Sequence, residues 1–231
     1  MVEVVPAIIA KDFRELKKKI KLVEPYIEWV QLDIMDGKFV PNETWRNPKD
    51  LKRIETPLNL EAHLMIQNPF RAIAGWLNSG CRRVIVHWES LGYNKEKELR
   101  KIIAKIKKAK GETGLALNPE TKWQEIEKFI PKLDLVLLMT VSPGFGGQKF
   151  IKEVIPKMES LRKSFPDVKI EVDGGINLKT GKLAARAGAN ILVVGSAIFE
   201  SENIGKTILE LENICPVIQL PVCFSAKRRK A

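Results

Sequence analysis

The chain has 231 residues, 45% of them hydrophobic, which is enough to form one sizeable buried core. Because no apolar run is long enough to span a bilayer, the N-terminus lacks the features of a signal peptide, and the three cysteines are scattered without metal-binding spacing, we expect a cytoplasmic protein with no membrane partner. The net charge of +11 would suit an anionic partner, but the basic residues are spread over expected helix faces without interleaved aromatic residues, so we expect no nucleic-acid partner.

Short apolar runs alternate with amphipathic stretches along the chain, a pattern typical of strand–helix units around a parallel sheet. Asp12 has the side chain and the position of an N-cap for the first helix. Expected strands cover residues 2–9, 27–34, 58–64, 83–87, 113–118, 133–141, 168–173 and 191–195. Expected helices cover residues 13–22, 48–53, 69–77, 95–110, 123–129, 150–164, 178–187 and 196–211.

Eight such units in a chain of this length match a closed barrel of parallel strands surrounded by helices. An open, doubly wound sheet is the alternative, but the dinucleotide-binding glycine pattern is absent after the first expected strand. No linker interrupts the alternation. We therefore expect one α/β domain over residues 1–215 and a basic C-terminal tail over residues 216–231.

A glycine-rich segment directly follows the apolar run of residues 133–141. Glycines let backbone N–H groups approach an anion closely, and the helix expected over residues 150–164 would point its N-terminus at that anion. A turn that needs glycine only for its backbone angles is the alternative. Because further glycine turns follow the seventh and eighth expected strands, we favour a phosphate site built from these late loops. The residues concerned are Gly144, Phe145, Gly146, Gly147, Gly174, Gly175, Gly195 and Ser196.

Polar side chains recur near the carboxyl ends of three expected strands. Gln31 and Asp33 share one face of the second strand, Glu61 and His63 share one face of the third, and Asp173 ends the seventh. If these faces point inward, Asp33, His63 and Asp173 converge over the barrel mouth. Two carboxylates and an imidazole can hold a divalent cation or move protons on either side of a substrate. For each residue singly, capping a helix or binding a backbone group is the alternative.

Three methionines, Met35, Met65 and Met139, lie at or just past strand ends. Methionine usually fills irregular space in a hydrophobic core. Three at one level of a barrel could instead form an apolar cushion that excludes water from a reacting carbon.

These stretches resemble the ribulose-phosphate 3-epimerase family over the chain up to about residue 215. That family is a TIM barrel of the ribulose-phosphate binding type, and its activity is the interconversion of D-ribulose 5-phosphate and D-xylulose 5-phosphate at C3. The matching segments are residues 32–37, 39–42, 63–65, 86–89, 143–150, 171–176 and 195–199.

The resemblance implies roles for the residues singled out above. Asp33 and Asp173 resemble the two acid/base residues, which also ligate a divalent metal, and His63 resembles a further ligand. The glycine turns resemble the phosphate loops, and the three methionines resemble a cap beside the enediolate. In such a reaction one carboxylate starts ionised and the other protonated, and a metal (Zn, Fe, Mn, Co or Mg) would stabilise the enediolate.

Three positions depart from the family pattern. Gln31 stands where the family has a histidine ligand, so we expect weaker metal binding and less preference for zinc than for manganese, magnesium or ferrous iron. Ala7 replaces a serine whose hydroxyl contacts substrate, and Arg46 replaces a glycine near the mouth, where it could contact or obstruct substrate or simply point to solvent. Glu61 could substitute as a ligand, orient one, or meet a partner in the barrel core.

The resulting expectation is a metal-dependent pentose-phosphate 3-epimerase of carbohydrate metabolism that acts on a small sugar phosphate and assembles as a homo-oligomer. One alternative is an epimerase of another ketose phosphate, such as a hexulose 6-phosphate. A second is a phosphosugar-binding barrel with impaired catalysis, which Gln31 and Ala7 motivate.

Overall fold

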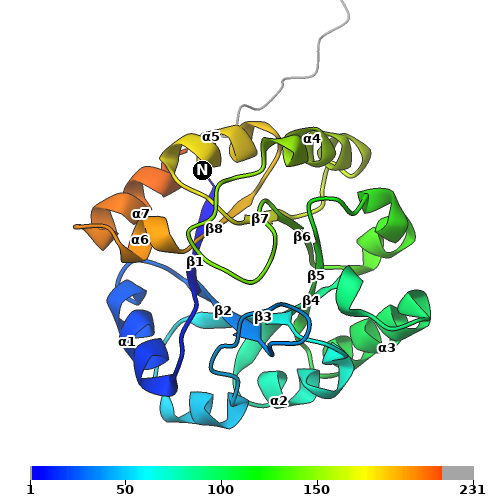
Figure 1. The fold of residues 1–231 in the computed structure, drawn as a ribbon, viewed down its shortest axis with the longest axis horizontal. Helices are drawn as coiled ribbons and strands as arrows, with labels where there is room; N and C mark the ends of the chain where they lie inside the picture. The colour runs from blue at the N-terminus through cyan, green and yellow to red at the C-terminus, as the bar shows by residue number, and fades with distance from the viewer. Residues whose placement is uncertain (1, 215–231) are drawn as a thin grey trace, which may run out of the picture.

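A computed structural model describes residues 2–214, and the basic tail expected over residues 216–231 lies outside them. Eight parallel strands close into a barrel in sequence order, and β1 pairs with β8 to complete the ring (Figure 1). The closed barrel is therefore confirmed and the open sheet is wrong. The strands are β1 (Glu3–Ile8), β2 (Trp29–Met35), β3 (Asn59–Met65), β4 (Cys81–His87), β5 (Glu112–Leu117), β6 (Leu135–Met139), β7 (Ile170–Asp173) and β8 (Ile191–Val194).

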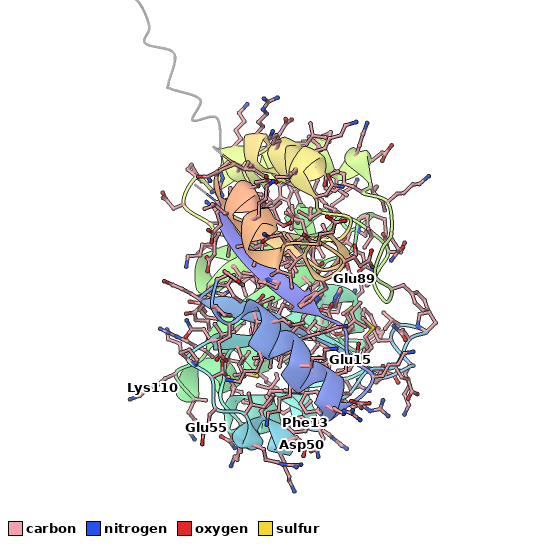
Figure 2. All side chains as sticks on the ribbon, turned by 90° about the vertical axis from the view of Figure 1, so that its left-hand side faces the viewer. Phe13, Glu15, Asp50, Glu55, Glu89 and Lys110 are labelled. Carbon is pink, nitrogen blue, oxygen red and sulfur yellow. The ribbon has the colours of Figure 1, made fainter. Side chains whose placement is uncertain are left out.

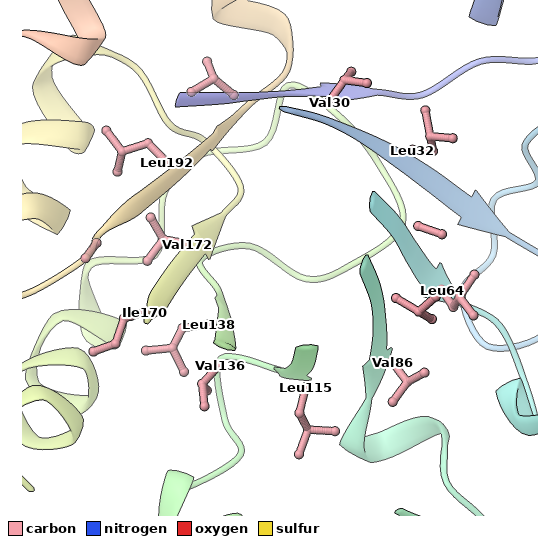
Figure 3. Packing of buried hydrophobic residues seen from close by; sticks show 14 of the residues in the cluster. Val30, Leu32, Leu64, Val86, Leu115, Val136, Leu138, Ile170, Val172 and Leu192 are labelled. Atoms are coloured by element: carbon pink, nitrogen blue, oxygen red, sulfur yellow. The ribbon is translucent and has the colours of Figure 1, made fainter. Parts of the chain in front are cut away.

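Side chains along each strand alternate between two environments, because successive residues of a strand face opposite sides of the sheet. Outward-facing aliphatic residues such as Leu32, Val172 and Leu192 pack under the surrounding helices, as Figure 3 shows. Their neighbours in sequence point into the barrel. Asp33 is in register with His63 on the next strand, so the inward polar residues of β2 and β3 lie side by side.

The helices form an outer ring. α1 starts where expected, since the Asp12 side chain accepts a hydrogen bond from the backbone N–H of Glu15 at 2.8 Å. The α-helices are α1 (Phe13–Val23), α2 (Ile73–Leu77), α3 (Lys95–Lys108), α4 (Ile155–Ser164), α5 (Leu178–Arg186), α6 (Ser196–Phe199) and α7 (Ile204–Glu212). The 3-10 helices cover Pro48–Arg53, Pro69–Arg71, Trp88–Ser90, Trp123–Lys132 and Lys152–Val154.

Two helix predictions are wrong. The helix expected from residue 150 begins at Ile155, with a proline in its first turn. Instead, the backbone N–H of Ile151 donates to the carbonyl of Thr140 at 2.8 Å, which ties the intervening segment to the end of β6. The helix expected after residue 195 is split into α6 and α7, and Asn203 caps the second piece.

The carboxyl ends of the strands can be located in a side view of the barrel. In the side view of Figure 2, Glu15 and Glu89 lie toward one end and Glu55 and Lys110 toward the other. Glu89 follows the carboxyl end of β4, whereas Lys110 precedes β5, so the first end is the one where the strands terminate. No helix in residues 2–214 has the length and apolar character needed to cross a membrane.

Candidate functional site

A cavity of about 410 Å³ opens at the carboxyl ends of the strands. Strand ends form its floor, and the segment after β6 passes over the barrel axis (Figure 1). Nearly all of the residues singled out from the sequence line it together. They are Ala7, Asp33, Met35, Met65, Met139, Gly144, Phe145, Gly146, Gly147, Asp173, Gly174, Gly175, Gly195 and Ser196.

Two carboxylates and an imidazole meet at the floor of the cavity. His63 Nδ1 lies 3.3 Å from Asp33 Oδ1 and 3.4 Å from Asp173 Oδ2. One candidate ligand atom from each of the three residues lies within 4.8 Å of the others. β2, β3 and β7 therefore bring together the convergence that the sequence predicted.

Gln31 lies beside this group, but its amide nitrogen, not its oxygen, faces the carboxylates. Nε2 donates to Asp33 Oδ1 and to Asp173 Oδ2, both at 2.8 Å. The oxygen, Oε1, is buried without a hydrogen-bond partner among the described residues. A half-turn of the amide exchanges the two atoms, so the same side chain can offer either a donor or an acceptor to the carboxylates.

The electrostatics of this group favour a cation. Burial, together with the charge of Asp173, raises the pKa of Asp33, against hydrogen bonds from His63 and Gln31 that lower it. Burial opposes charge on His63, but its interactions with Asp173 and Asp33 raise its pKa to about 10. The donor set suits a divalent ion, since His63 Nδ1 and Gln31 Oε1 are both buried without a hydrogen-bond partner in the described chain.

His87 extends the group toward β4 and received no role from the sequence. Its Nε2 lies 2.8 Å from His63 Nε2, with only 12° between the ring planes. This separation is shorter than a stacking contact, so the rings share a hydrogen bond. Beyond it, His87 Nδ1 lies 3.6 Å from Glu89 Oε2. His87 could have been noted from the sequence, because it follows the inward-facing alternation of β4.

The glycine turns enclose the opposite side of the cavity, and their backbone conformations explain part of the glycine content. Gly175 has φ +63°, and a Cβ there would lie 2.6 Å from the backbone nitrogen of Phe150. Gly147 has φ +71° but open space around it. Gln148 closes the segment after β6 by donating to the carbonyls of Ser142 and Phe145 at 2.7 and 2.9 Å. Glycine at these turns therefore meets a backbone requirement, as at Gly175, and also leaves room for an anion, as at Gly147.

Met35 and Met65 are paired in register and packed with Val40, while Met139 joins the barrel-interior cluster with Ala7. All three methionines are buried and line the same cavity. Their role as an apolar cushion stays a prediction. Ala7 lies on the cavity wall, so the hydroxyl that the family's serine would supply is absent from the site itself.

The loop after β2 reaches across the mouth. Asn42 Nδ2 donates to the carbonyl of Gly144 at 2.8 Å, and Val40 packs against the same glycine. Arg46 is half-exposed, pairs with Glu43 at 3.3 Å and does not line the cavity. Of the three possibilities for Arg46, namely contacting substrate, obstructing it or pointing to solvent, the structure supports the last.

A second buried group lies one level deeper in the barrel, at Glu61, Arg83, Glu112 and Glu171, which we call the lower cluster. Arg83 Nη1 lies 2.6 Å from Glu61 and 3.7 Å from Glu171, and Nη2 lies 2.8 Å from Glu112. The Arg83 guanidinium also stacks over Trp29 at 4.0 Å. Burial raises the pKa of Glu61 to about 7, against the charge of Arg83. Glu61 is thus a barrel-core partner of Arg83, and neither it nor Glu171 belongs to the candidate cation group.

Comparison with known proteins identifies the family. The model described as "Ribulose-phosphate 3 epimerase family" matches residues 3–199. The ribulose-phosphate 3-epimerase of Bacillus subtilis (strain 168) is 42% identical over 219 residues, covering 91% of this chain and 98% of that protein. The ribulose-phosphate 3-epimerase of Schizosaccharomyces pombe is 37% identical over 217 residues, covering 91% and 92%.

Solved structures agree on the architecture. The 3-hexulose-6-phosphate synthase from Salmonella typhimurium matches with a TM-score of 0.70 at 16% identity, covering 92% of this chain and 97% of that one, a likeness that shows the shared fold. The sequence matches go further, because they extend over nearly the whole length of both partners. The chain belongs to the ribulose-phosphate 3-epimerase family.

Proposed function

We propose that this enzyme inverts C3 of D-ribulose 5-phosphate to give D-xylulose 5-phosphate, with Asp33 and Asp173 as the two proton-transfer groups. The observation that carries the proposal is the meeting of these two carboxylates at the floor of a methionine-lined cavity whose opposite side consists of glycine turns.

Inversion next to a ketone requires one group to remove the C3 proton from one face and another to return a proton to the opposite face. One carboxylate must therefore start ionised and the other protonated. The raised pKa of Asp33 supports such a division, because burial and the nearby Asp173 charge disfavour ionising both groups together. Their roles exchange when the reaction runs in reverse.

A divalent cation would be held by Asp33, His63 and Asp173. Gln31 would be a fourth ligand after its amide rotates so that Oε1, in place of Nε2, faces the cation. When bound, such an ion polarises the substrate oxygens and stabilises negative charge during proton removal. The buried methionines would keep water from the reacting carbon, since they line the same cavity as the two carboxylates and offer it apolar surface.

The phosphate would lie at the glycine turns. Gly147, Gly175 and Ser196 separate the cavity from a neighbouring groove of about 510 Å³, whose lining includes Lys149, Lys152 and Lys179. Glycine turns, which allow close approach to backbone N–H groups, and lysines in the neighbouring groove suit a phosphate monoester. Anchoring this remote end uses binding energy to align C3 between the carboxylates.

Incubation of the protein with ribulose 5-phosphate in D₂O, with Mn²⁺, Mg²⁺, Zn²⁺, Co²⁺ or Fe²⁺ added separately, tests the proposal. We expect solvent deuterium at C3 and formation of xylulose 5-phosphate. Asp173→Asn should lose this exchange. Asp12→Asn is its matched control and should keep the exchange, because Asn also caps helices and Asp12 lies outside the cavity. Binding of sugar phosphate without exchange under any metal would overturn the proposal.

The same assay with a hexulose 6-phosphate tests the substrate. Ala7 lines the cavity without the hydroxyl that the family's serine would offer to substrate, so the choice of sugar has a test of its own. Faster exchange with the six-carbon substrate would move the assignment from a pentose to a hexose phosphate while leaving the two carboxylate roles in place.

A further inference from the structure

The chain from Glu89 through His87 to His63 has no part in the proton transfer described above, yet every member is largely buried. His63 and His87 are the only two histidines of the sequence. Their Nε2 atoms share one hydrogen bond at 2.8 Å, so one ring must donate and the other must accept. Which ring donates decides which nitrogen of His63 can give up its proton to a cation.

Glu89 decides the direction. Its Oε2 lies 3.6 Å from His87 Nδ1, and neither atom has a hydrogen-bond partner among the described residues. A carboxylate oxygen beside Nδ1 favours a proton on that nitrogen, because two lone pairs facing each other would repel. His87 Nε2 is then an acceptor and His63 Nε2–H is the donor, so Nδ1, which faces Asp33 and Asp173, is the nitrogen of His63 that gives up its proton when a cation binds.

We propose that His87 is a positioning residue, oriented by Glu89, which fixes the tautomer of His63 in which Nδ1 can ligate a cation. This rests on the proposed metal site. The outer partner of a metal-binding histidine is commonly a carboxylate or carbonyl, and here an imidazole relays the carboxylate's preference across one more hydrogen bond.

The loop after β5 holds Glu89 in a fixed orientation. Glu89 Oε1 accepts the backbone N–H of Asn118 at 2.9 Å and the hydroxyl of Thr121. Lys157 in turn holds this loop by donating to the carbonyls of Asn118, Pro119 and Thr121 at 2.7 to 3.0 Å. Both donors meet the same oxygen, so only Oε2 is left to face His87.

This arrangement makes Glu89→Gln a directed test. The amide oxygen of the new side chain must stay at the Oε1 position, because two donors point at it. Its NH₂ group then faces His87 Nδ1 in place of the carboxylate oxygen and favours a lone pair on that nitrogen. His87 Nε2–H would donate to His63 Nε2, which leaves His63 with a single proton on Nδ1, where it blocks the cation. The substitution therefore reverses the His87 tautomer and confines the His63 proton to Nδ1, with little change in shape.

Selective ¹⁵N labelling of histidine gives two ring systems, whose nitrogen shifts report which atom carries the proton. In the wild-type protein we expect the His87 proton on Nδ1, and in Glu89→Gln on Nε2. A Zn²⁺ titration by calorimetry should show affinity lowered by roughly 10- to 100-fold in the variant. Glu125→Gln is the control, because Glu125 accepts from the neighbouring Trp88 at 2.9 Å without touching either imidazole.

A second variant guards against a trivial loss of folding. In His87→Gln the amide oxygen can accept from His63 whatever stands at position 89, so adding Glu89→Gln to it should cost no further zinc affinity. A wild-type His87 proton on Nε2, or unchanged ¹⁵N shifts and zinc affinity in Glu89→Gln, would overturn the inference. Absence of zinc binding by the wild type would contradict the metal site, while the His87 tautomer would still decide this proposal.

Discussion

Two groups of charged side chains lie inside the barrel, one above the other. The upper cluster, Gln31, Asp33, His63, His87 and Asp173, opens to the cavity. The lower cluster pairs its buried carboxylates with the Arg83 guanidinium. In the upper cluster two carboxylates share one imidazole and one amide instead of a guanidinium. Buried polar atoms without a hydrogen-bond partner among the described residues occur in both clusters, including both oxygens of Glu171.

The difference shows how burial serves stability in one place and chemistry in another. The carboxylates of the lower cluster have the Arg83 guanidinium as a counter-ion within the protein, whereas in the proposed function those of the upper cluster receive a cation and a substrate. Breaking the lower cluster should therefore unfold the protein, and breaking the upper one should stop the reaction.

Asp173→Asn gives the largest expected effect on chemistry. The variant keeps the shape of the side chain but cannot exchange a proton, so we expect kcat to fall by about 10³-fold. Steady-state epimerisation assays measure this, and thermal unfolding should show that the barrel remains folded. Retained turnover would refute the acid/base role of Asp173.

Arg83→Met gives the largest expected effect on stability. It leaves Glu61 and Glu171 buried without their cation, which should lower the free energy of unfolding by about 3–5 kcal/mol. Denaturant unfolding checks this. Arg82→Met is the matched control, because the Arg82 side chain is 60% exposed and should change stability by only about 0.5 kcal/mol. Equal losses in the two variants would break the distinction between the clusters.

Gln31→His tests whether position 31 of the upper cluster ligates the metal. Imidazole is a better ligand than an amide oxygen and needs no rotation away from the carboxylates, so metal affinity should rise by about tenfold or more, most clearly for zinc. Calorimetric titration measures the change. If affinity stays the same, Gln31 does not ligate the metal.

Asn42→Ala gives the smallest expected effect. It removes the hydrogen bond that joins the loop after β2 to Gly144 across the cavity mouth, a loss of about 1 kcal/mol. We expect a higher KM with little change in kcat, because the carboxylates do not move. Asn47→Ala in the same segment is the control, since Asn47 contacts Asp50 on the outer side. A drop in kcat alone would contradict this role.

The sequence predicted the strands and the convergence of Asp33, His63 and Asp173 because both follow from local pattern and barrel geometry. Short apolar runs specify buried parallel strands, and residues at their carboxyl ends must meet when the barrel closes. The late start of the helix after β6 was missed because it depends on tertiary hydrogen bonds, such as that of Ile151 to Thr140. The helix after β8 begins where expected, at Ser196, but its break between α6 and α7 was missed.

The lower cluster could not be found from local pattern. Arg83 follows Arg82 at the start of a strand, where a basic pair is typical of a surface. Only the register of β3 against β4 places Arg83 beside Glu61 and turns it inward. The uncertainty about Glu61 had the same origin, because its partner is twenty-two residues away in sequence.

In the proposed function the upper cluster moves a proton at C3 of a sugar phosphate. The most direct measurement follows the C3 proton of ribulose 5-phosphate by ¹H NMR in D₂O with the wild-type protein and each divalent metal. We predict loss of that signal, with deuterium appearing at C3 of both ribulose and xylulose 5-phosphate. A C3 signal that persists with every metal, while the folded protein binds the sugar phosphate, would contradict the claim.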